Sequence, residues 1–302
     1  MKIITLTLSP AVDIEYHTEK ITPDGLNRTS SHAVTAGGKG VNVSRAILNC
    51  AREAGVDVQL ETVVPLGGAS GEMFRDILER EGLPVIPVEI EGNTRINASL
   101  IPDTGDSLEI NAPGTPLGDR LGEVERLLLD RLKPGDVVVI AGSVPSDVPK
   151  SYPAELCRKI KAAGAVCLTD ADGAVLEYLV KEGHPDLIKP NADELARLAG
   201  HELNTLDDVM DAAESLSGVG AVITTLAADG AVFTKPLGSS PDDPDEAQSS
   251  FYPTEERPVV RLKGAGDTFL GAYLFCRYIG GMDDHDAMVE ATHIAGDYVA
   301  GV

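Results

Sequence analysis

The sequence predicts an α/β fold in which helices cover both faces of one mostly parallel sheet. Strand-like apolar runs alternate with helical patterns along most of the chain, which is typical of this class. The segment at 136–140 is almost continuously apolar, as expected for a strand buried on both faces of a parallel sheet. The chain has 302 residues, of which 43% are hydrophobic, so it can bury a large core. We therefore expect one domain spanning 1–302.

The individual elements follow from local patterns. The opening segment is rich in β-branched residues and indicates a strand. The segment at 71–81 places its apolar residues on one helical face, and the helix that follows it stops at Pro134-Gly135. Predicted strands cover 3–8, 59–64, 136–140, 166–169, 186–188 and 221–225, and predicted helices cover 41–54, 71–81, 117–132, 265–279 and 285–299.

Three stretches interrupt this alternation. Residues 14–33 and 85–110 contain short strand patterns without helical periodicity, and we expect them to pair as a small antiparallel lid over the main sheet. Residues 236–258 include an acidic tract with several prolines, which predicts an exposed loop.

The charge of the chain limits its partners. Forty-eight acidic residues against 25 basic ones give a net charge of -23. Such a field repels nucleic acid and anionic membranes, so neither is expected as a partner. The charge indicates either an ordinary solvated acidic surface or adaptation to a high-salt cytoplasm, where screening shortens the Debye length to about 3 Å at 1 M salt.

The cysteines and the apolar runs point to a cytoplasmic protein. Cys50, Cys157, Cys167 and Cys276 have no zinc-ligand or CxxC spacing, which predicts reduced, mostly buried thiols. The first ten residues lack the apolar stretch of a signal peptide. No segment reaches the roughly 20 apolar residues of a membrane span.

The strongest local motif is Gly264-Ala265-Gly266-Asp267-Thr268, which lies directly before an apolar helix. Glycines at this position allow backbone N–H groups to converge at the positive end of the helix dipole and bind an anion. An aspartate in the first turn can then accept a proton from an alcohol. The alternative is a plain N-cap, in which the carboxylate of Asp267 binds the helix amides.

A second glycine motif runs from Ala36 to Arg45. Its paired glycines allow close approach of the backbone to a ligand, and Asn42 opens a helix where its amide can face a pocket. The alternative is a tight turn carrying a surface lysine. The sequence has no GxxxxGK[ST] and no GxGxxG after the first strand, which argues against a Walker P-loop and a Rossmann dehydrogenase.

Seven motifs, taken in order, resemble the ribokinase-like (PfkB-type) sugar kinases along nearly the whole chain. Each motif is weak alone, and their order and spacing carry the resemblance. They are Ser9-Pro10-Ala11-Val12-Asp13, AGGKGVNVSRA at 36–46, Thr94-Arg95-Ile96-Asn97, Ala141-Gly142-Ser143-Val144-Pro145, KPNADEL at 189–195, TLAADGA at 225–231 and GAGDTF at 264–269.

The resemblance implies a doubly covered sheet with a small β-sheet lid, and phosphoryl transfer from ATP with Mg²⁺. It implies that Asp267 is the catalytic base. By matching position it implies a substrate site at Asp13, Gly37, Gly38, Asn42 and Ser143, an anion hole at Gly264, Ala265 and Gly266, nucleotide contacts at Lys189, Asn191, Thr225 and Gly230, and a magnesium site at Asn191 and Glu194, expected on one helix face.

Within the family, the chain is most similar to the phosphosugar branch that includes 1-phosphofructokinase and tagatose-6-phosphate kinase. Arg28, Lys39 and Arg95 are the reason, because arginine suits bidentate recognition of phosphate. The alternative is that both arginines face solvent. Ser9, Ala227 and the segment 261–263 depart from the usual pattern of this branch, which leaves the sugar and the nucleotide open.

The expected activity is transfer of the γ-phosphate of ATP to a primary hydroxyl of a sugar 1-phosphate, with fructose 1-phosphate favoured. The sequence leaves open a ribose-1-phosphate kinase, a kinase of nucleosides or unphosphorylated sugars, and a sugar-binding protein without catalysis. It also leaves open a homodimer formed through the exposed face of the lid.

Overall fold

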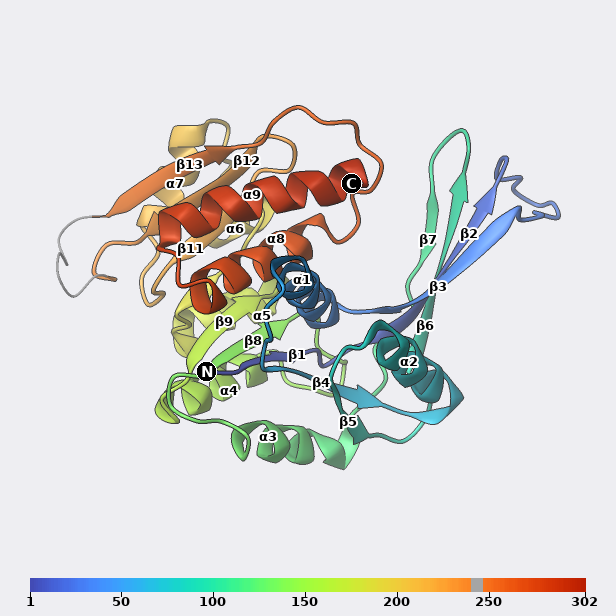
Figure 1. Cartoon of the computed structure of the whole chain (residues 1–302), viewed down its shortest axis with the longest axis horizontal. Coiled ribbons are helices and arrows are strands. Elements are labelled where there is room, and N and C mark those ends of the chain that lie inside the picture. The colour runs from blue at the N-terminus through green and yellow to red at the C-terminus, as the bar shows by residue number, and fades with distance from the viewer. Residues whose placement is uncertain (240–246) are drawn as a thin grey trace.

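The computed structural model describes residues 1–239 and 247–302, and it confirms a large sheet between two layers of helices (Figure 1). Within the described residues, this sheet has nine strands in the order β13-β12-β11-β10-β9-β8-β1-β4-β5. All pairs from β5 through β11 are parallel, whereas β12 and β13 are antiparallel. The strands are β1 (Ile3–Leu6), β4 (Leu60–Leu66), β5 (Val85–Glu89), β8 (Val137–Ala141), β9 (Val166–Asp170), β10 (Leu187–Ile188), β11 (Val222–Thr225), β12 (Gly230–Lys235) and β13 (Gln248–Pro253).

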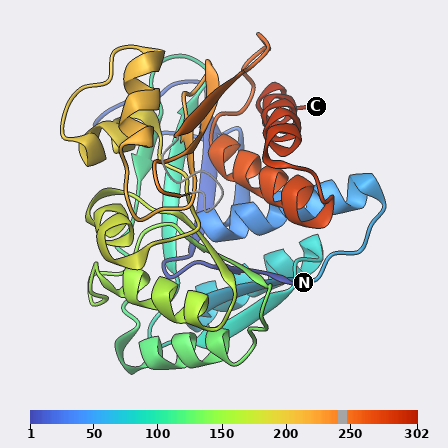
Figure 2. The same cartoon turned by 90° about the vertical axis from the view of Figure 1, so that its left-hand side faces the viewer.

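The central strands are apolar on both faces because helices cover both. Neighbouring residues of β1 belong to different hydrophobic clusters, Ile3 to one and Ile4 to the other. Figure 2 shows the two helical layers on opposite sides of the sheet. One layer contains α1 (Lys39–Ala54), α2 (Gly68–Glu81), α8 (Ala265–Leu274) and α9 (Asp284–Ala300); the other contains α3 (Leu121–Leu129), α4 (Tyr152–Ala162), α5 (Gly173–Tyr178), α6 (Ala192–Ala199) and α7 (Leu206–Glu214).

Most predicted helix boundaries agree with the structure to within a few residues. The predicted helix at 117–132 is shorter, because a 3-10 turn η1 (Gly118–Arg120) precedes α3 and the helix ends at Leu129. The predicted helix at 265–279 continues past α8 as a wider π-type turn, η3 (Phe275–Ile279). A similar turn, η2 (Leu179–Gly183), follows α5.

A second, small sheet projects from one side of the molecule (Figure 1). Its strand order is β3-β2-β6-β7, comprising β2 (Ala11–Thr18), β3 (Ser31–Gly37), β6 (Arg95–Pro102) and β7 (Leu108–Ile110). The predicted pairing was wrong in two respects. The central pair β2–β6 is parallel, and β5, inside the segment assigned to the lid, instead pairs with β4 in the large sheet. The apolar pattern of β5 suits that buried edge.

The predicted exposed loop at 236–258 was also partly wrong. Residues 240–246 lie outside the described residues, but β13 pairs with β12 over six residues. Phe251 and Tyr252 in β13 pack against the apolar clusters. The prediction of a loop rested on the neighbouring acidic tract and overlooked these two apolar residues.

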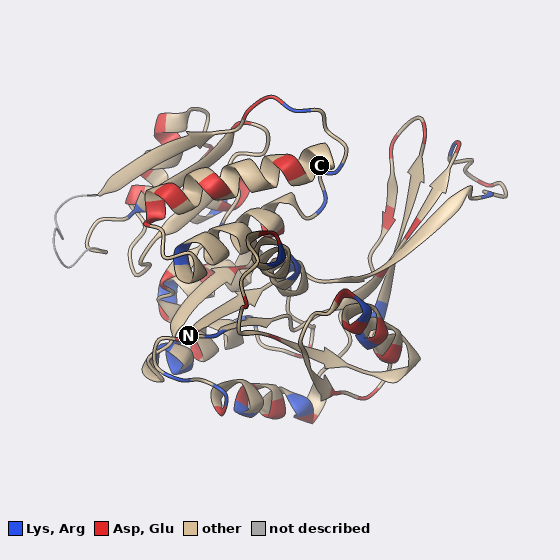
Figure 3. Ribbon diagram, viewed as in Figure 1, with Lys and Arg blue, Asp and Glu red and all other residues tan. Residues whose placement is uncertain are grey.

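The cysteines and the acidic residues can be located in the structure. All four cysteines are free and buried. Acidic residues lie along the outward ribbon of α9, which illustrates the charge imbalance (Figure 3). None of the helices in the described part of the chain combines the length and the apolar content needed to cross a bilayer.

Candidate active site

The candidate site lies where the parallel strands of the large sheet end. Ligands of open α/β sheets usually bind outside the carboxyl ends of the strands, where the following loops and helix N-termini converge. The glycine motif after β3 opens α1, and the glycine motif before α8 opens that helix. Helices α1 and α8 pack against each other, so the two motifs meet.

Asp267 is held inside this junction rather than at a helix cap. Gly264 is the N-cap of α8, and the helix has no side-chain capping hydrogen bond, so the alternative of a plain aspartate cap is excluded. Asp267 is only 8% exposed. Its Oδ2 accepts a hydrogen bond of 2.8 Å from Nδ2 of Asn42 on α1. The predicted base and the predicted substrate ligand Asn42 are therefore direct neighbours.

The surroundings of Asp267 raise its pKa to about 6. Burial is the main cause, because it disfavours the charged carboxylate, and repulsion from Asp170 adds to it. The hydrogen bond from Asn42 and the charges of Lys189 and Lys39 act in the opposite direction. A carboxylate with this pKa is ionised at neutral pH and is a stronger base than an ordinary aspartate.

The first turn of α8 presents backbone amides that have no partner within the described residues. They are the N–H groups of Gly264, Gly266 and Asp267. The predicted anion hole is corrected at Ala265, because its N–H donates to the carbonyl of Leu262 at 3.1 Å. The positive end of the helix dipole and the unpaired amides together form a site for an anion.

Lys189 adds a positive charge to this anion site. Its Nζ lies 3.4 Å from the point that a Cβ on Gly266 would occupy. A side chain at position 266 would thus approach the ammonium group, and glycine keeps that space open. Lys189 is only 6% exposed, so its charge acts in a largely desolvated environment.

Asp170 balances the charges of two lysines, and it was not among the residues predicted from the sequence. Its Oδ1 lies 2.8 Å from Nζ of Lys39, and its Oδ2 lies 3.0 Å from Nζ of Lys189. Burial alone would raise the pKa of Asp170, but both lysines outweigh burial and lower it. Burial likewise acts to lower the pKa of Lys39, and Asp170 reverses this and raises it. The available signal was a carboxylate at the carboxyl end of a buried parallel strand.

Asp13, a predicted substrate residue in β2, is held by groups from several elements. Its Oδ1 accepts a hydrogen bond of 2.8 Å from Nδ2 of Asn97 in β6. Nζ of Lys263 lies 3.6 Å from Oδ2 of Asp13 and 3.7 Å from the carboxylate of Glu15. A Cβ at Gly37 would lie 2.2 Å from Oδ2 of Asp13, so a larger residue there would displace this carboxylate.

The other predicted substrate residues surround Lys39. Gly38 has φ of 133°, and a Cβ there would lie 2.7 Å from Cγ2 of Thr7. Gly142, after β8, faces the side chain of Lys39. Ser143 follows it and is exposed.

Arg95, a predicted phosphate ligand, binds backbone carbonyls. Its guanidinium donates to the backbone carbonyls of Ser9 at 2.8 Å, Ala112 at 3.0 Å and Pro10 at 3.4 Å. Burial lowers the pKa of Arg95, and the nearby Asp13 opposes this. The side chain joins the small sheet to the loop after β1, with three of its five N–H groups engaged in this way.

The structure does not bring Arg28 to the candidate site of the same chain. Its carbonyl accepts a hydrogen bond from the hydroxyl of Thr18 at the end of β2. Thr18 is five residues beyond Asp13 on that strand, a separation of roughly 16 Å at about 3.3 Å per residue. Figure 1 shows the loop between β2 and β3 at the far tip of the small sheet.

The predicted nucleotide residues lie just after β10, at the end of β11 and at the start of β12. The N–H of Thr225 donates to the carbonyl of Pro190 at 3.0 Å, which joins two of these loops. Strand packing explains the glycine at position 230, because a Cβ there would lie 2.1 Å from the carbonyl oxygen of Tyr252 in β13. The close approach of β13 requires glycine at this position whether or not a nucleotide binds.

Asn191 and Glu194 form a capping box. Asn191 is the N-cap of α6 and not part of a helix face, so that expectation was wrong. Oδ1 of Asn191 accepts from the N–H of Glu194, and Oε2 of Glu194 accepts from the N–H of Asn191. No cluster of three His, Cys, Asp or Glu suited to a metal occurs in the described residues. The pair fits Mg²⁺ only through Glu194, with water and phosphate oxygens as the other ligands.

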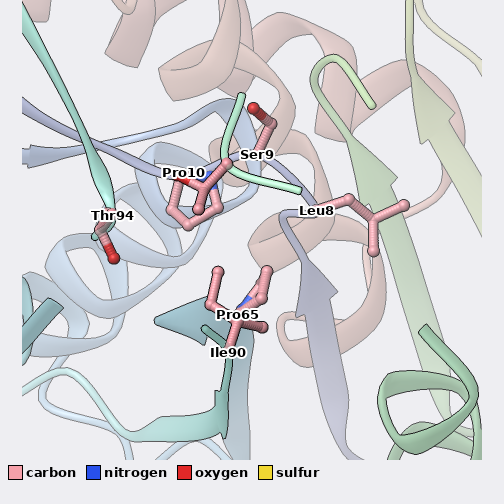
Figure 4. Close-up of a pocket in the computed structure, with 7 residues that line it drawn as sticks. Leu8, Ser9, Pro10, Pro65, Ile90 and Thr94 are labelled. Carbon is pink, nitrogen blue, oxygen red and sulfur yellow. The ribbon is translucent and has the colours of Figure 1, made fainter. Parts of the chain in front are cut away.

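A small pocket is lined in part by Ser9 and Pro10 (Figure 4), whose backbone carbonyls bind Arg95. It has almost no internal volume, and none of its lining residues is charged. The hydroxyl of Ser9 is buried there without a hydrogen-bond partner in the described residues. The pocket lacks the groups needed for phosphate chemistry, so the site described above remains the candidate. Its lining residues are Leu8, Ser9, Pro10, Pro65, Ile90, Thr94 and Thr115.

The fold and the site together define a sugar kinase, an enzyme that transfers a phosphoryl group to an alcohol. A buried carboxylate, helix amides without a partner in the described residues and a lysine pair meet at the edge of a parallel sheet, as such chemistry requires. The chain belongs to the pfkB family of carbohydrate kinases, whose family model matches residues 6–296.

Named relatives agree with this membership. The chain is 33% identical over 275 residues to the 1-phosphofructokinase of Bacillus subtilis, covering 90% of this chain and 84% of that protein. It is 31% identical over 277 residues to the ATP-dependent 6-phosphofructokinase isozyme 2 of Escherichia coli, with the same coverage. A crystal structure of phosphofructokinase-2 from Escherichia coli in complex with substrates and products has a TM-score of 0.88 and 27% identity, covering 99% of this chain and 94% of that chain.

Proposed function

We propose that the protein is an ATP-dependent phosphosugar kinase that prefers fructose 1-phosphate. The observation that carries the proposal is Asp267, a buried carboxylate of raised pKa at the N-terminus of α8. The Bacillus subtilis relative named 1-phosphofructokinase supports the preference for this sugar. The relative named 6-phosphofructokinase supports phosphosugars as a class.

In the proposed reaction, Asp267 acts as general base. The oxygen of a primary sugar hydroxyl attacks the γ-phosphorus of ATP while Asp267 accepts its proton. The bond between the γ-phosphorus and the bridging oxygen breaks, and ADP leaves with the electron pair. Asn42 already occupies Oδ2 of Asp267, which leaves Oδ1 to accept the proton. The amides of Gly264 and Gly266 and the ammonium of Lys189 stabilise the developing negative charge.

The acceptor sugar is proposed to bind between the small sheet and the start of α1. Asp13 and Asn97 present a carboxylate and an amide suited to sugar hydroxyls. Lys263 reduces the repulsion that Asp13 and Glu15 would exert on a phosphorylated sugar, because its ammonium lies close to both carboxylates. Closing the small sheet over this site would exclude water from the reaction.

The nucleotide and the metal are proposed to occupy the loops after β10 and β11. Thr225 and Gly230 border this region, and Asn191 and Glu194 stand at the start of α6. Bound Mg²⁺ would neutralise charge on the phosphates, with Glu194 and water among its ligands. Lys189 lies between this region and the first turn of α8.

The outward face of the small sheet supports a homodimer through the lid. The cross-strand register places Val34, Ile96, Leu108 and Ile110 on the face opposite Asp13. All four are between 37% and 54% exposed, and an apolar sheet face of this kind favours pairing. Light scattering after gel filtration should give twice the mass of one chain. Ile96→Glu should reduce it to one chain, and Val56→Glu, which alters an equally exposed residue after α1, should not.

The function is tested by measuring ADP formation with ATP and Mg²⁺ at low and at molar salt. Acceptors are fructose 1-phosphate, fructose 6-phosphate, tagatose 6-phosphate, ribose 1-phosphate, fructose, ribose and nucleosides. We expect fructose 1-phosphate to give the highest kcat/KM, and Asp267→Asn to lower kcat by at least about 10³-fold. A preference for ribose 1-phosphate or for an unphosphorylated acceptor would contradict the proposed substrate. Absence of turnover on every acceptor would favour a sugar-binding protein.

A further inference from the structure

The orientation of the Asn42 amide is determined by a second residue, Arg45, one turn further along α1. Nη1 of Arg45 donates a hydrogen bond of 2.8 Å to Oδ1 of Asn42. The other end of the same amide, Nδ2, donates to Oδ2 of Asp267. A flipped amide would place its NH₂ against the guanidinium and its oxygen against the carboxylate, so both contacts would become repulsive. Only one orientation satisfies both neighbours.

Arg45 is itself held rigidly. Its Nε lies 2.9 Å from Oε2 of Glu81, and its Nη2 lies 3.2 Å from Oε1, which makes the pair bidentate. Nη2 also donates to the carbonyl of Ala36 at 3.0 Å. Glu81 is the last residue of α2, so the arrangement links α2 to α1 and then to the base on α8. A bidentate arginine has little freedom to rotate, because its planar fork matches the carboxylate.

We propose that Arg45 is a positioning residue that acts through Asn42 to keep Asp267 oriented as the base, with Glu81 as its anchor. The proposal rests on the proposed role of Asp267. Within the described residues, Arg45 reaches Asp267 through the Asn42 amide, and its further contacts are with Glu81 and the carbonyl of Ala36. The remaining charged groups around Asp267 are Asp170, Lys39 and Lys189, and none of them contacts Arg45.

The test uses Arg45→Met and a matched control on the same helix. Arg52 also lies on α1 and donates to the end of α2 through the carbonyl of Glu81, but it has no contact with Asn42. Arg45→Met should lower kcat about 10-fold to 100-fold while changing KM for ATP less than about twofold. The acid limb of the kcat–pH profile should shift upward by about one pH unit, because Asp267 loses an oriented donor that lowers its pKa. Arg52→Met should leave the rate and the profile unchanged.

A double mutant separates positioning from a general effect on folding. In an Asn42→Ala background, Arg45→Met should cause no further shift of the acid limb, because the residue through which it acts is gone. An additional shift there, or an unshifted profile in Arg45→Met alone, would overturn the proposal. If Arg45→Met fails to fold, Glu81→Gln should give a smaller shift in the same direction, and no shift would equally contradict the proposal.

Failure of the inference differs from failure of the proposed function. If Asp267→Asn is inactive and Arg45→Met shows a wild-type profile, Asp267 remains the base and Arg45 does not position it. If Asp267→Asn retains full activity, the base itself is wrong and the inference falls with it.

Discussion

Nζ of Lys189 lies 3.0 Å from Oδ2 of Asp170, and both side chains are almost completely buried. This ion pair lies directly behind the first turn of α8, where the anion site is proposed. It keeps a positive charge next to the unpaired amides without leaving that charge uncompensated in the protein interior. Burying each charge costs free energy, and the attraction between the two charges offsets this cost, because buried charges are stable only when they are paired.

Removing the shared carboxylate should therefore destabilise the fold. Asp170→Asn leaves the buried ammonium of Lys189 without a counter-charge, and we expect a loss of about 3 to 5 kcal/mol in the free energy of unfolding measured with urea. Asp130→Asn is the control, because Asp130 pairs with Arg126 at 3.6 Å on the exposed surface and should cost less than about 1 kcal/mol. Equal losses for the two variants would refute the structural role of Asp170.

Asp267→Asn should be more stable than the wild type at neutral pH, although inactive. The folded-state pKa of Asp267 is about 6, above the unfolded value of roughly 4. The folded state therefore binds more protons than the unfolded state between these values, and stability falls as pH rises through this window. At pH 7.5 the asparagine variant avoids this penalty, worth up to about 3 kcal/mol.

The advantage of Asp267→Asn should shrink to about half at pH 5, since more of the folded wild type is protonated there. Urea unfolding at both pH values measures it. Asp106→Asn, in the exposed turn between β6 and β7, should change stability by less than about 0.5 kcal/mol at either pH. A pH-independent advantage would show that another cause is responsible.

Gly37→Ala should weaken acceptor binding. The new Cβ would lie 2.2 Å from Oδ2 of Asp13, so the carboxylate must move away from its position beside Asn97. We expect KM for the sugar to rise about tenfold or more with KM for ATP nearly unchanged. Gly122→Ala in α3 is the control. A Cβ at this position would contact nothing within 4 Å, and alanine is favoured over glycine in a helix, so the acceptor KM should not change. Unchanged acceptor KM in Gly37→Ala would argue against Asp13 as a sugar ligand.

Ala227→Gly should stabilise the protein. Ala227 has φ of 52°, a left-handed conformation that costs a residue with a Cβ roughly 1 kcal/mol. Glycine removes this strain and loses part of the gain through the entropy of the unfolded chain, so the net gain should be a few tenths to about 1 kcal/mol. Ala228→Gly, at a neighbouring residue without positive φ, should instead destabilise. Thermal unfolding of both variants measures the difference, and a loss of stability in Ala227→Gly would contradict the strain argument.

Local signals in the sequence were sufficient to predict the large sheet and the position of Asp267 at the start of a helix. A strand buried on both faces requires a continuous apolar run, and 136–140 has one, so β8 could be predicted from its residues. The glycines before α8 indicated a helix N-terminus, and Asp267 lies in its first turn. These features depend on residues that are close together in the chain, and the ordered motifs then indicated the family.

Only the tertiary structure decided which distant groups meet. Asp170 binds Lys39 across 131 positions, and Asn42 reaches Asp267 across 225, so neither contact leaves a local pattern. Arg95 looked like a phosphate ligand, yet it binds backbone carbonyls that only the folded chain brings to it. The strand β5 pairs with β4 in the large sheet, and its own residues do not specify that partner. Pairing of charges and strands depends on distance in space, and the fold sets that distance.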